Sequence, residues 1–175
     1  MNELMAEKEL AMIIEFLGSR NIMFEHITHE HVHGSEEAAK IRGNRIEQAA
    51  KAIVLKVRKK KSKENNSKDY EFIQCVVPGH KRIDLKKLKS ILDLDNASLA
   101  SPEEVLERTN CTVGSVPPFG SLFGLQTYMD RSVLEQEYIF FSAGTHNDSV
   151  KVRSIDYVNV LKPEVTEFCS EHTQN

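Results

Sequence analysis

Apolar and polar residues recur along this chain with two different periods, and the two periods separate expected helices from expected strands. Leu10, Ile13 and Leu17 recur at helical spacing, so residues 3–18 are expected to form a helix that stops at Gly18. The same spacing, together with local start signals, predicts further helices at about residues 35–41, 84–94, 101–109 and 155–161.

Residue types that cap helices stand where several of these helices are expected to begin. Ser35, Asp84 and Ser101 each carry a short side-chain oxygen that can accept a hydrogen bond from the first turn. Pro102 then fills the first helical position, where its missing N–H is not needed. Gly43 is expected to end the second helix.

Runs rich in β-branched and aromatic residues predict strands, and they lie at residues 22–29, 50–59, 69–79, 137–144 and 149–155. The polar run KKKSKENNSK (59–68) reads as a long hairpin connection between two of them. Residues 121–129 form a further apolar segment, and the residues from 162 onward are expected to be a loose polar tail. Helices and strands are intermixed, which favours an α+β or mixed-sheet domain over a doubly wound parallel one.

Composition is that of one compact domain, because the chain has 175 residues and is 40% hydrophobic. The net charge of −3 hides a basic middle, since residues 51–89 carry 13 basic and 4 acidic groups. Such a segment can attract phosphate backbones, or it can be a solvated surface loop. No apolar run approaches the ~20 residues of a spanning helix, and the acidic amphipathic N-terminus lacks the features of a secretory signal. A cytoplasmic location is therefore expected.

The cysteines are few and far apart. Cys75, Cys111 and Cys169 form no C-x-x-C pair, which argues against a disulfide framework and against a structural zinc site. We expect three free thiols. Cys75 lies in the apolar run FIQCVV and is expected to be a small buried residue.

Four histidines stand together in EHITHEHVHG, at positions 26, 29, 31 and 33. On an extended chain His29, His31 and His33 would project to one face, where three imidazoles could bind a transition metal. The run has no cysteine or carboxylate partner in an obvious place and ends just before a helix cap, where polar residues are ordinary. A metal-binding protein is therefore one interpretation among several.

No well-marked catalytic motif occurs: the sequence has no G-x-S-x-G, Walker loop, G-x-G-x-x-G or H-E-x-x-H. Three features could still build a pocket, namely Lys51 at the start of an apolar strand, the Gly- and Pro-rich stretch 111–120, and the turn GTHND (144–148). Each also has a plain structural interpretation. A strand-edge lysine can extend its amine to water, and Gly, Pro, Asn and Asp are ordinary turn residues.

The order of several segments resembles the YbaK/EbsC family, also called the prolyl-tRNA synthetase associated domain. The matching pieces are HVHGSEEAA, QAAKAIVLKV, VVPGHKRIDLKKLKSIL, LASPEEVLERTNCTVGSVPPFG, YMDRSVLEQEYIFFSAGTHNDSVKV and IDYVNVL, which span about residues 22–161. The resemblance implies one domain over residues 1–175, a mixed β-sheet curled into a partly open barrel with surrounding helices. It leaves a flexible basic insert at about 58–69 and a loose tail at about 162–175.

The family resemblance also implies an activity. It suggests a free-standing, trans-editing deacylase that hydrolyses the ester of a mischarged tRNA, with tRNA(Pro) carrying alanine or cysteine as the expected substrate. The implied partners are aminoacyl-tRNA and an aminoacyl-tRNA synthetase on which the protein could dock, and no cofactor is implied. The alternative is a non-catalytic module of the same fold that binds tRNA or a synthetase.

Site residues follow from the family's strand lysine, G-x-x-x-P segment and polar turn. The expected catalytic residues are Lys51, Gly114 and His146. The expected substrate contacts are Ser115, Val116, Pro117, Pro118, Gly144, Thr145 and Asn147, and the expected tRNA contacts are Lys56, Arg58, Lys59, Lys60 and Lys61. Some family members carry a longer H-P-x-x-N turn, whereas His146 and Asn147 are adjacent here and Asp148 adds a negative charge.

Overall fold

The computed structural model describes residues 2–60 and 69–170, with the side chains of residues 2–6 left aside. The helices are α1 (Asn2–Gly18), α2 (Ser35–Arg42), α3 (Leu85–Ile91), α4 (Pro102–Thr109) and α5 (Ser154–Leu161), with short 3₁₀ turns at Ile46–Gln48, Gly120–Phe123 and Arg131–Glu135. The strands are β1 (Phe24–Thr28), β2 (Ala50–Lys59), β3 (Glu71–Pro78), β4 (Arg82–Ile83), β5 (Leu94–Leu99), β6 (Gln126–Asp130), β7 (Tyr138–Ser142), β8 (Asp148–Arg153), β9 (Glu164–Thr166) and β10 (Cys169–Ser170). None of the helices within these residues is long and apolar enough to cross a membrane.

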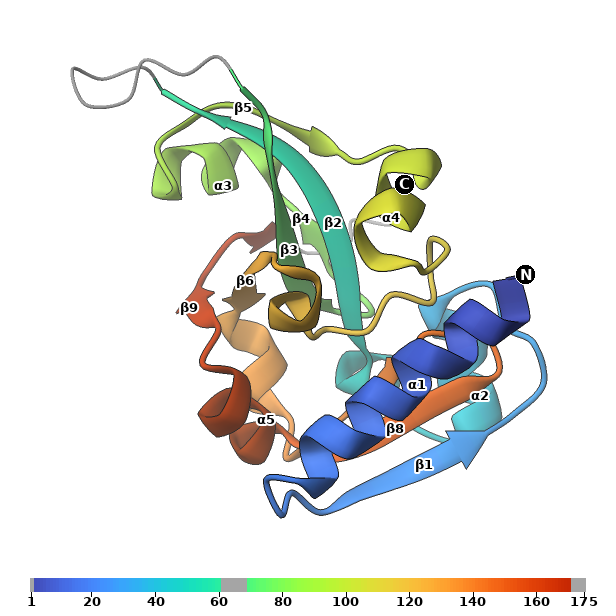
Figure 1. Cartoon of the computed structure of the whole chain (residues 1–175). Helices are drawn as coiled ribbons and strands as arrows, with labels where there is room; N and C mark the ends of the chain where they lie inside the picture. Colours follow the sequence, from blue (N-terminus) through green and yellow to red (C-terminus); the bar gives the residue numbers. More distant parts are fainter. Residues whose placement is uncertain (1, 61–68, 171–175) are drawn as a thin grey trace.

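The larger sheet is mixed and has five strands in the order β5-β2-β3-β6-β9. β2 and β3 form the expected antiparallel hairpin, with Ala50 opposite Pro78 and Val57 opposite Glu71. β6 joins β3 in parallel, and β9 joins β6 in parallel. β2 is the longest strand of the molecule and reaches from one end of this sheet to the other (Figure 1).

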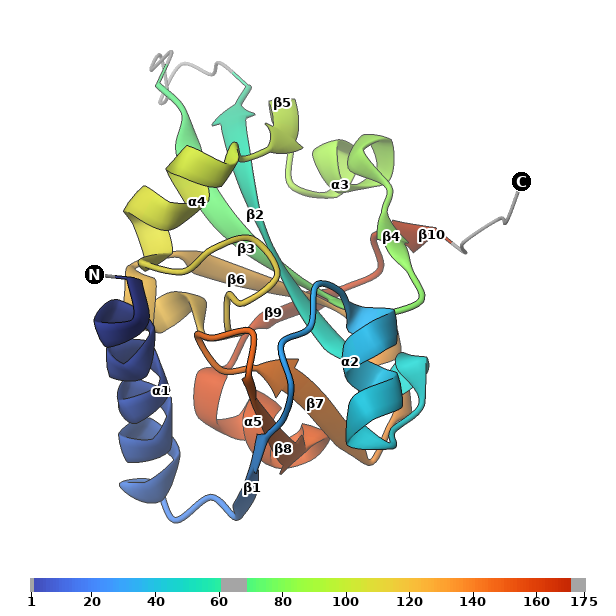
Figure 2. The same cartoon turned by 90° about the vertical axis from the view of Figure 1, so that its right-hand side faces the viewer.

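Helices α3 and α4 cover opposite faces of the β2–β3 hairpin (Figure 2). Successive side chains of a strand point to opposite faces, so Leu55 and Val57 join a buried cluster with Leu88 of α3. Val54 points the other way and packs with Val105 of α4. The alternation in β2 therefore supplies two separate cores.

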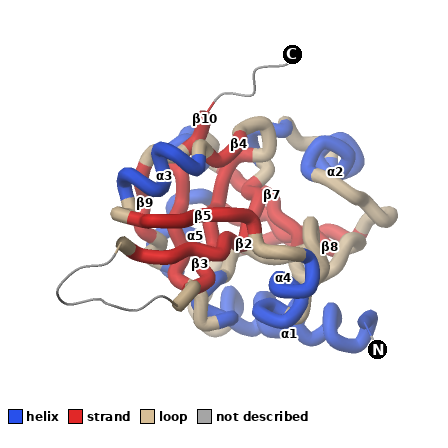
Figure 3. The backbone as a smooth tube through the Cα atoms, turned by 90° about the horizontal axis from the view of Figure 1, so that it is seen from above, coloured by secondary structure: helices blue, strands red, loops and turns tan. Residues whose placement is uncertain are grey.

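The smaller sheet is antiparallel, in the order β1-β8-β7, and lies against α1 (Figure 1). Its core contains Ile13 of α1, Val150 of β8 and Tyr157 of α5. Phe119 lies at the centre of this core, with its ring 5.6 Å from that of Phe16 and 5.3 Å from that of Phe141. Seen from above, helices surround the strands and the sheets do not close on themselves (Figure 3). The expected α+β class with a mixed, partly open arrangement is confirmed.

Several strands were not expected, and β5 replaces the end of a predicted helix. Residues 84–94 were predicted to be helical throughout, but α3 ends at Ile91 and β5 begins at Leu94. Asp93 between them has a positive φ of 51°, which a continuing helix cannot accommodate. The sequence LDNASL has weak strand propensity, so pairing with β2 decides its conformation.

Two local predictions were also wrong. Ser35 does not cap α2: Gly34 is the N-cap residue and Ser35 is the first helical residue. The tail is not loose over residues 162–170, because β9 pairs with β6 and β10 pairs with β4. The central part of the basic insert, residues 61–68, lies outside the described residues.

Candidate functional site

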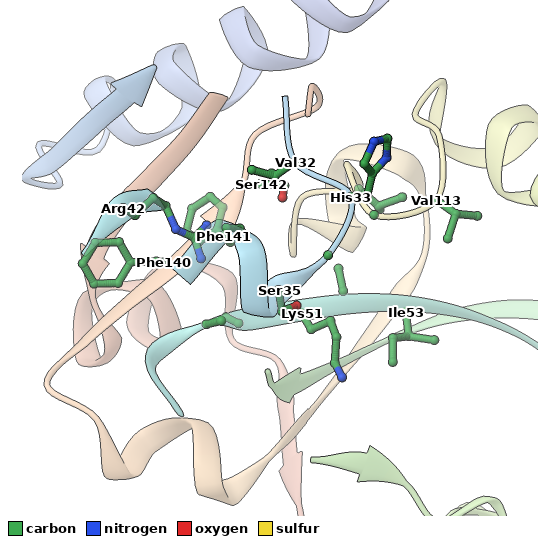
Figure 4. Close-up of a pocket in the computed structure, with 17 residues that line it drawn as sticks. Val32, His33, Ser35, Arg42, Lys51, Ile53, Val113, Phe140, Phe141 and Ser142 are labelled. Carbon is green, nitrogen blue, oxygen red and sulfur yellow. The ribbon is translucent and has the colours of Figure 1, made fainter. Parts of the chain in front are cut away.

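A cavity of about 220 Å³ opens beside the N-terminal half of β2 (Figure 4). It lies where the free edge of β2 is left uncovered. β5 pairs with β2 only from Leu55 onward, and β7 forms an isolated bridge from Phe140 to Ala49, the residue before β2. The walls are Val32, His33, Gly34, Ser35, Ala38, Arg42, Ala49, Ala50, Lys51, Ala52, Ile53, Val113, Gly114, Val116, Phe140, Phe141 and Ser142.

The backbone of β2 presents hydrogen-bonding groups to this gap. The N–H of Ala100 donates to the carbonyl oxygen of Val54 at 3.0 Å, so the polar backbone groups of Val54 face away from β3. In an antiparallel pair the direction alternates from residue to residue. The N–H and C=O of Ala52 therefore face the same way as those of Val54, on the edge where the cavity lies.

The opposite wall is a tight turn over residues 112–115. It is closed by the N–H of Ser115, which donates to the carbonyl of Thr112 at 3.1 Å. Gly114 has a φ of 92° at the third position, where type II turns favour glycine. In the described part of the chain, no acceptor meets the N–H groups of Gly114 and Val116. This turn therefore supplies unpaired donors at the cavity wall.

The two prolines of the G-x-x-x-P segment lie behind this wall and do not line the cavity. The carbonyl of Pro117 accepts a hydrogen bond from Nε2 of Gln74 at 2.9 Å, and the carbonyl of Pro118 accepts one from the hydroxyl of Tyr157. Both donors are fully buried. The prolines therefore fix the turn to the core, and Val116 alone of the three residues after Ser115 faces the cavity.

Lys51 lines the cavity with its stem, and its ammonium group is turned to the loop after β3. Nζ donates to the carbonyl of Gly79 at 3.3 Å and to that of Lys81 at 3.0 Å. In Figure 4 the side chain runs away from Ser142 and His33. Burial lowers the pKa of Lys51, and the nearby charge of Arg82 acts in the same direction.

His146 lies behind Gly114 and is not among the residues that line the cavity. Its Nδ1 is 2.9 Å from the carbonyl of Val32, which can only accept, so Nδ1 carries the hydrogen. Nε2 is 2.9 Å from the hydroxyl of Thr112. Burial lowers the pKa of His146, and the neighbouring imidazoles of His31 and His33 lower it further. At neutral pH the ring is uncharged and links the segment at Val32 to the turn at Thr112.

The remaining residues of the expected pocket hold the turns together. The N–H of Gly144 donates to the carbonyl of Ser115 at 3.0 Å, which joins the two turns directly. The hydroxyl of Thr145 donates to Asp148 at 2.6 Å, and the exposed amide of Asn147 donates to the carbonyl of His29 at 3.3 Å. Of the expected site residues, Lys51, Gly114 and Val116 share the cavity, whereas His146, Ser115, Gly144, Thr145 and Asn147 support it from outside.

Several lining residues were missed from the sequence. Ser35 lies at the start of α2, and Ser142 ends β7, so two hydroxyl groups reach the cavity from distant parts of the chain. Arg42 contributes a guanidinium group that also donates to Ser149 at 3.1 Å and lies over the ring of Phe140. Burial lowers the pKa of Arg42 to about 10. A signal for Ser35 existed in the segment HVHGSEEAA, but nothing local marked Ser142 or Arg42.

Four of the five basic residues expected to contact tRNA lie in the described part of the chain, and each has an acidic neighbour. The ion pairs are Lys56 with Glu104, Arg58 with Asp95, Lys59 with Glu71, and Lys60 with Asp93. Lys61 lies outside the described residues. Exposed ion pairs are worth roughly 0–1 kcal/mol each, so an RNA phosphate can compete for these side chains.

The clustered histidines do not act as one unit. His29 bonds to the carbonyl of Glu30 and to the hydroxyl of Ser149, both at 2.7 Å. The rings of His31 and His33 instead lie beside His146, with centroids 4.8 and 6.4 Å from it. Among the described residues, no group of three potential ligands is placed to hold a metal ion. The three free thiols expected from the sequence are confirmed, and burial raises the pKa of Cys75 to about 12.

Comparison with known proteins adds a family match. The family model described as "Aminoacyl-tRNA editing domain" matches residues 29–160. The "Multifunctional Ser/Thr-tRNA deacylase ProXp-y" of Escherichia coli K12 is 33% identical over 157 residues, which are 89% of this chain and 90% of the relative. The uncharacterised protein YwhH of Bacillus subtilis is 32% identical over 108 residues, 61% of this chain and 68% of the relative.

Solved structures share the fold. A crystal structure of a hypothetical protein superposes with a TM-score of 0.78 at 19% identity and covers 90% of this chain and 99% of its own. The crystal structure of a candidate trans-editing enzyme for prolyl tRNA synthetase gives a TM-score of 0.74 at 21% identity, with 93% and 97% covered. These likenesses confirm the architecture expected from the sequence.

Proposed function

Because the chain belongs to the aminoacyl-tRNA editing domain family, we propose that it is a free-standing deacylase that hydrolyses the ester of a mischarged tRNA. The expectation of an aminoacyl-tRNA hydrolase is confirmed at the level of the family. The observation that supports it best in this chain is the cavity between β2 and the turn at Gly114, where backbone donors without partners meet small side chains.

The proposed chemistry uses these backbone donors. Attack of water on the ester carbonyl places negative charge on its oxygen, and two fixed N–H groups can stabilise that charge. Gly114 and Val116 supply such a pair on a turn that is bonded to the core through Pro117 and Pro118. The N–H and C=O of Ala52 lie on the β2 edge and are available to orient the aminoacyl group.

Water is the proposed nucleophile, and the substrate's own free ribose hydroxyl is proposed to accept its proton while passing its own proton to the ribose oxygen that leaves as the ester bond breaks. Among the residues that line the cavity, there is no carboxylate and no cysteine. His146 already uses both ring nitrogens, for Val32 and for Thr112. We therefore assign His146 to positioning the Gly114 turn, and Lys51 to holding the β2 end and the loop at Gly79 in place near the terminal nucleotide.

The cavity favours a small amino acid. Its volume is about 220 Å³, and its walls include alanines at positions 38, 49, 50 and 52. The hydroxyl groups of Ser35 and Ser142 and the guanidinium of Arg42 provide polar partners there. The Escherichia coli relative is named for Ser- and Thr-tRNA. We therefore place serine and threonine ahead of the alanine and cysteine on tRNA(Pro) that the family resemblance suggested.

A deacylation panel tests this function. Purified protein is incubated with tRNAs charged with serine, threonine, alanine, cysteine and proline, and loss of labelled amino acid is followed. We expect serine or threonine to be released fastest. The Ser142→Ala variant should release serine and threonine more slowly, with a smaller effect on the release of alanine from alanine-charged tRNA. Ser90→Ala, on the exposed surface of α3, is the matched control. Binding of charged tRNA without turnover of any amino acid would instead indicate a non-catalytic module.

A further inference from the structure

We propose that a second surface, away from the cavity, binds unpaired nucleotides of the RNA substrate by stacking. This surface, called the cation–aromatic stripe, consists of Lys56 and Arg58 on β2, Tyr70 just before β3, Phe72 on β3, and Arg108 on α4. The inference rests on the proposed function for the identity of the RNA, and on the side-chain arrangement for the binding mode.

The stripe follows from the strand register. Lys56 is paired directly opposite Phe72 in the β2–β3 hairpin. Arg58 lies two residues further along β2, so it projects to the same face as Lys56. Val54 precedes them on that face and is covered by α4, whereas Arg58 and Tyr70 lie beyond the end of the core. A row of cations and rings thus continues a buried strand face into solvent.

Cations already lie over both rings. Nζ of Lys56 is 5.1 Å from the ring centroid of Tyr70, and Cζ of Arg58 is 5.2 Å from it. Cζ of Arg108 is 4.5 Å from the ring of Phe72. Tyr70 is nevertheless 43% exposed. An exposed ring flanked by fixed cations is the combination that single-stranded nucleic acids use, with bases stacked on the ring and phosphates near the charges.

Carboxylates hold two of the three cations of the stripe in place, Lys56 and Arg58. Glu104 lies 2.5 Å from Lys56, and Asp95 lies 2.6 Å from Arg58. Side chains at both pairs remain a quarter or more exposed. Exposed pairs of this kind contribute little net stability, so a phosphate can replace a carboxylate. The pairs keep the cations beside the rings when no RNA is bound.

The stripe and the cavity belong to one strand. Ala52 lines the cavity, and Lys56 and Arg58 follow it by four and six residues. At the rise of a strand this places them ~13 and ~20 Å away. A tRNA whose terminal ester enters the cavity has its neighbouring unpaired nucleotides within that range. The stripe is therefore placed to hold the 3′ end while the cavity holds the amino acid.

Binding of uncharged RNA tests the stripe without relying on catalysis. The affinity of the protein is measured for a short single-stranded RNA oligonucleotide ending in CCA and for an RNA duplex of equal charge. We expect Tyr70→Ala to weaken binding of the single strand tenfold or more, and Tyr70→Phe to retain it, because stacking needs the ring. Tyr138→Ala is the control, since Tyr138 also lies 5.0 Å from a cation, Lys151, but on the smaller sheet.

The outcomes separate this inference from the proposed function. Selective loss in Tyr70→Ala supports the stripe even if no charged tRNA is hydrolysed. Equal affinity of Tyr70→Ala, Tyr138→Ala and the parent protein would overturn it, as would a parent protein that binds no single strand. Equal binding of duplex and single strand, insensitive to Tyr70, would show contact through phosphates alone and would also overturn stacking.

Discussion

The imidazole of His146 lies against the backbone of Gly114 so closely that a side chain at position 114 would touch it. A Cβ built on Gly114 would be 3.3 Å from Cε1 of His146 and 3.6 Å from the carbonyl oxygen of His33. Glycine is needed here for two reasons. The backbone has a positive φ of 92°, and the His146 ring, which is hydrogen-bonded to Val32 and Thr112, lies in close contact with it.

Gly114→Ala should impair both stability and catalysis. The backbone conformation costs a non-glycine residue about 1–2 kcal/mol, and the new methyl group would displace His146 or the turn. We expect a lower free energy of unfolding and a fall in kcat/KM of at least tenfold, because the Gly114 and Val116 donors move from their positions. Thermal unfolding and deacylation rates measure the two effects.

Gly124→Ala is the matched control for that substitution. Gly124 also has a positive φ, 68°, but nothing lies within 4 Å of the Cβ built on it, and it does not line the cavity. It should lose similar stability and keep kcat/KM near the parent value. If both variants lost activity equally, the close contact at Gly114 would have no part in catalysis.

His146→Asn should remove a pH dependence of stability. The pKa of His146 in the folded chain is lowered, whereas the unfolded chain has the ordinary histidine value of about 6.5. As the pH falls, the imidazole of His146 is therefore protonated at a higher pH in the unfolded chain than in the folded chain. The contribution of neutral His146 to the free energy of unfolding is complete above the unfolded-state pKa of about 6.5. It is lost as the pH falls through the lower folded-state pKa. The stability difference between parent and variant should shrink over that range in denaturant titrations at several pH values.

The same variant separates positioning from general base catalysis. Asparagine can keep a donor toward the carbonyl of Val32, so a positioning role predicts a loss in kcat/KM of less than about 100-fold and an unchanged shape of the pH–rate profile. A larger loss, with the acid limb of the profile abolished, would show that His146 takes a proton in the reaction.

Asp130→Asn should destabilise the chain by about 2–3 kcal/mol, because the buried carboxylate accepts from three backbone N–H groups. Those donors are Ser132 at 3.1 Å, and Phe168 and Cys169 at 2.8 Å each. An amide can accept on one side only. Burial alone would raise the pKa of Asp130, but the hydrogen bonds from Ser132, Phe168 and Cys169 outweigh burial and lower it.

The pH dependence of this effect has a definite sign. The stability that ionised Asp130 contributes is complete above the aspartate pKa of the unfolded chain, about 3.9. It is lost as the pH falls through the lower pKa of the folded chain. Denaturation curves of parent and variant should therefore converge only in strong acid. Asp93→Asn is the control, because that carboxylate is exposed and should change stability by about 0.5 kcal/mol or less.

The sequence predicted best those elements whose own residues determine their conformation. Strands such as β2 and β7 are rich in β-branched and aromatic residues, and α4 carries its cap at Ser101. β5 was missed because Asp95 and Asn96 have low strand propensity and are held by pairing with β2. The tail was misjudged for a similar reason, since Phe168 is fully buried by contacts with distant residues.

Residues that line the cavity were predictable from the sequence only where the family resemblance marked them. Lys51, Gly114 and Val116 stand in recognisable segments and do share the cavity. Ser142 and Arg42 come from elements separated by a hundred residues, so nothing in their own surroundings indicates that they meet. The burial of Pro117 and Pro118 could not be seen either, because it depends on Gln74 and Tyr157.

The late position of β9 in the chain has a consequence for synthesis on the ribosome. β6 acquires its outer neighbour only from residues 164–166, and the cluster around Leu55 and Leu88 acquires Phe168 later still. While the chain emerges from its N-terminus, the sheet therefore keeps an open edge that other nascent chains can pair with. Folding of this sheet can finish only after residues 164–168 have left the exit tunnel, so translation that stalls before residue 164 would leave an aggregation-prone product.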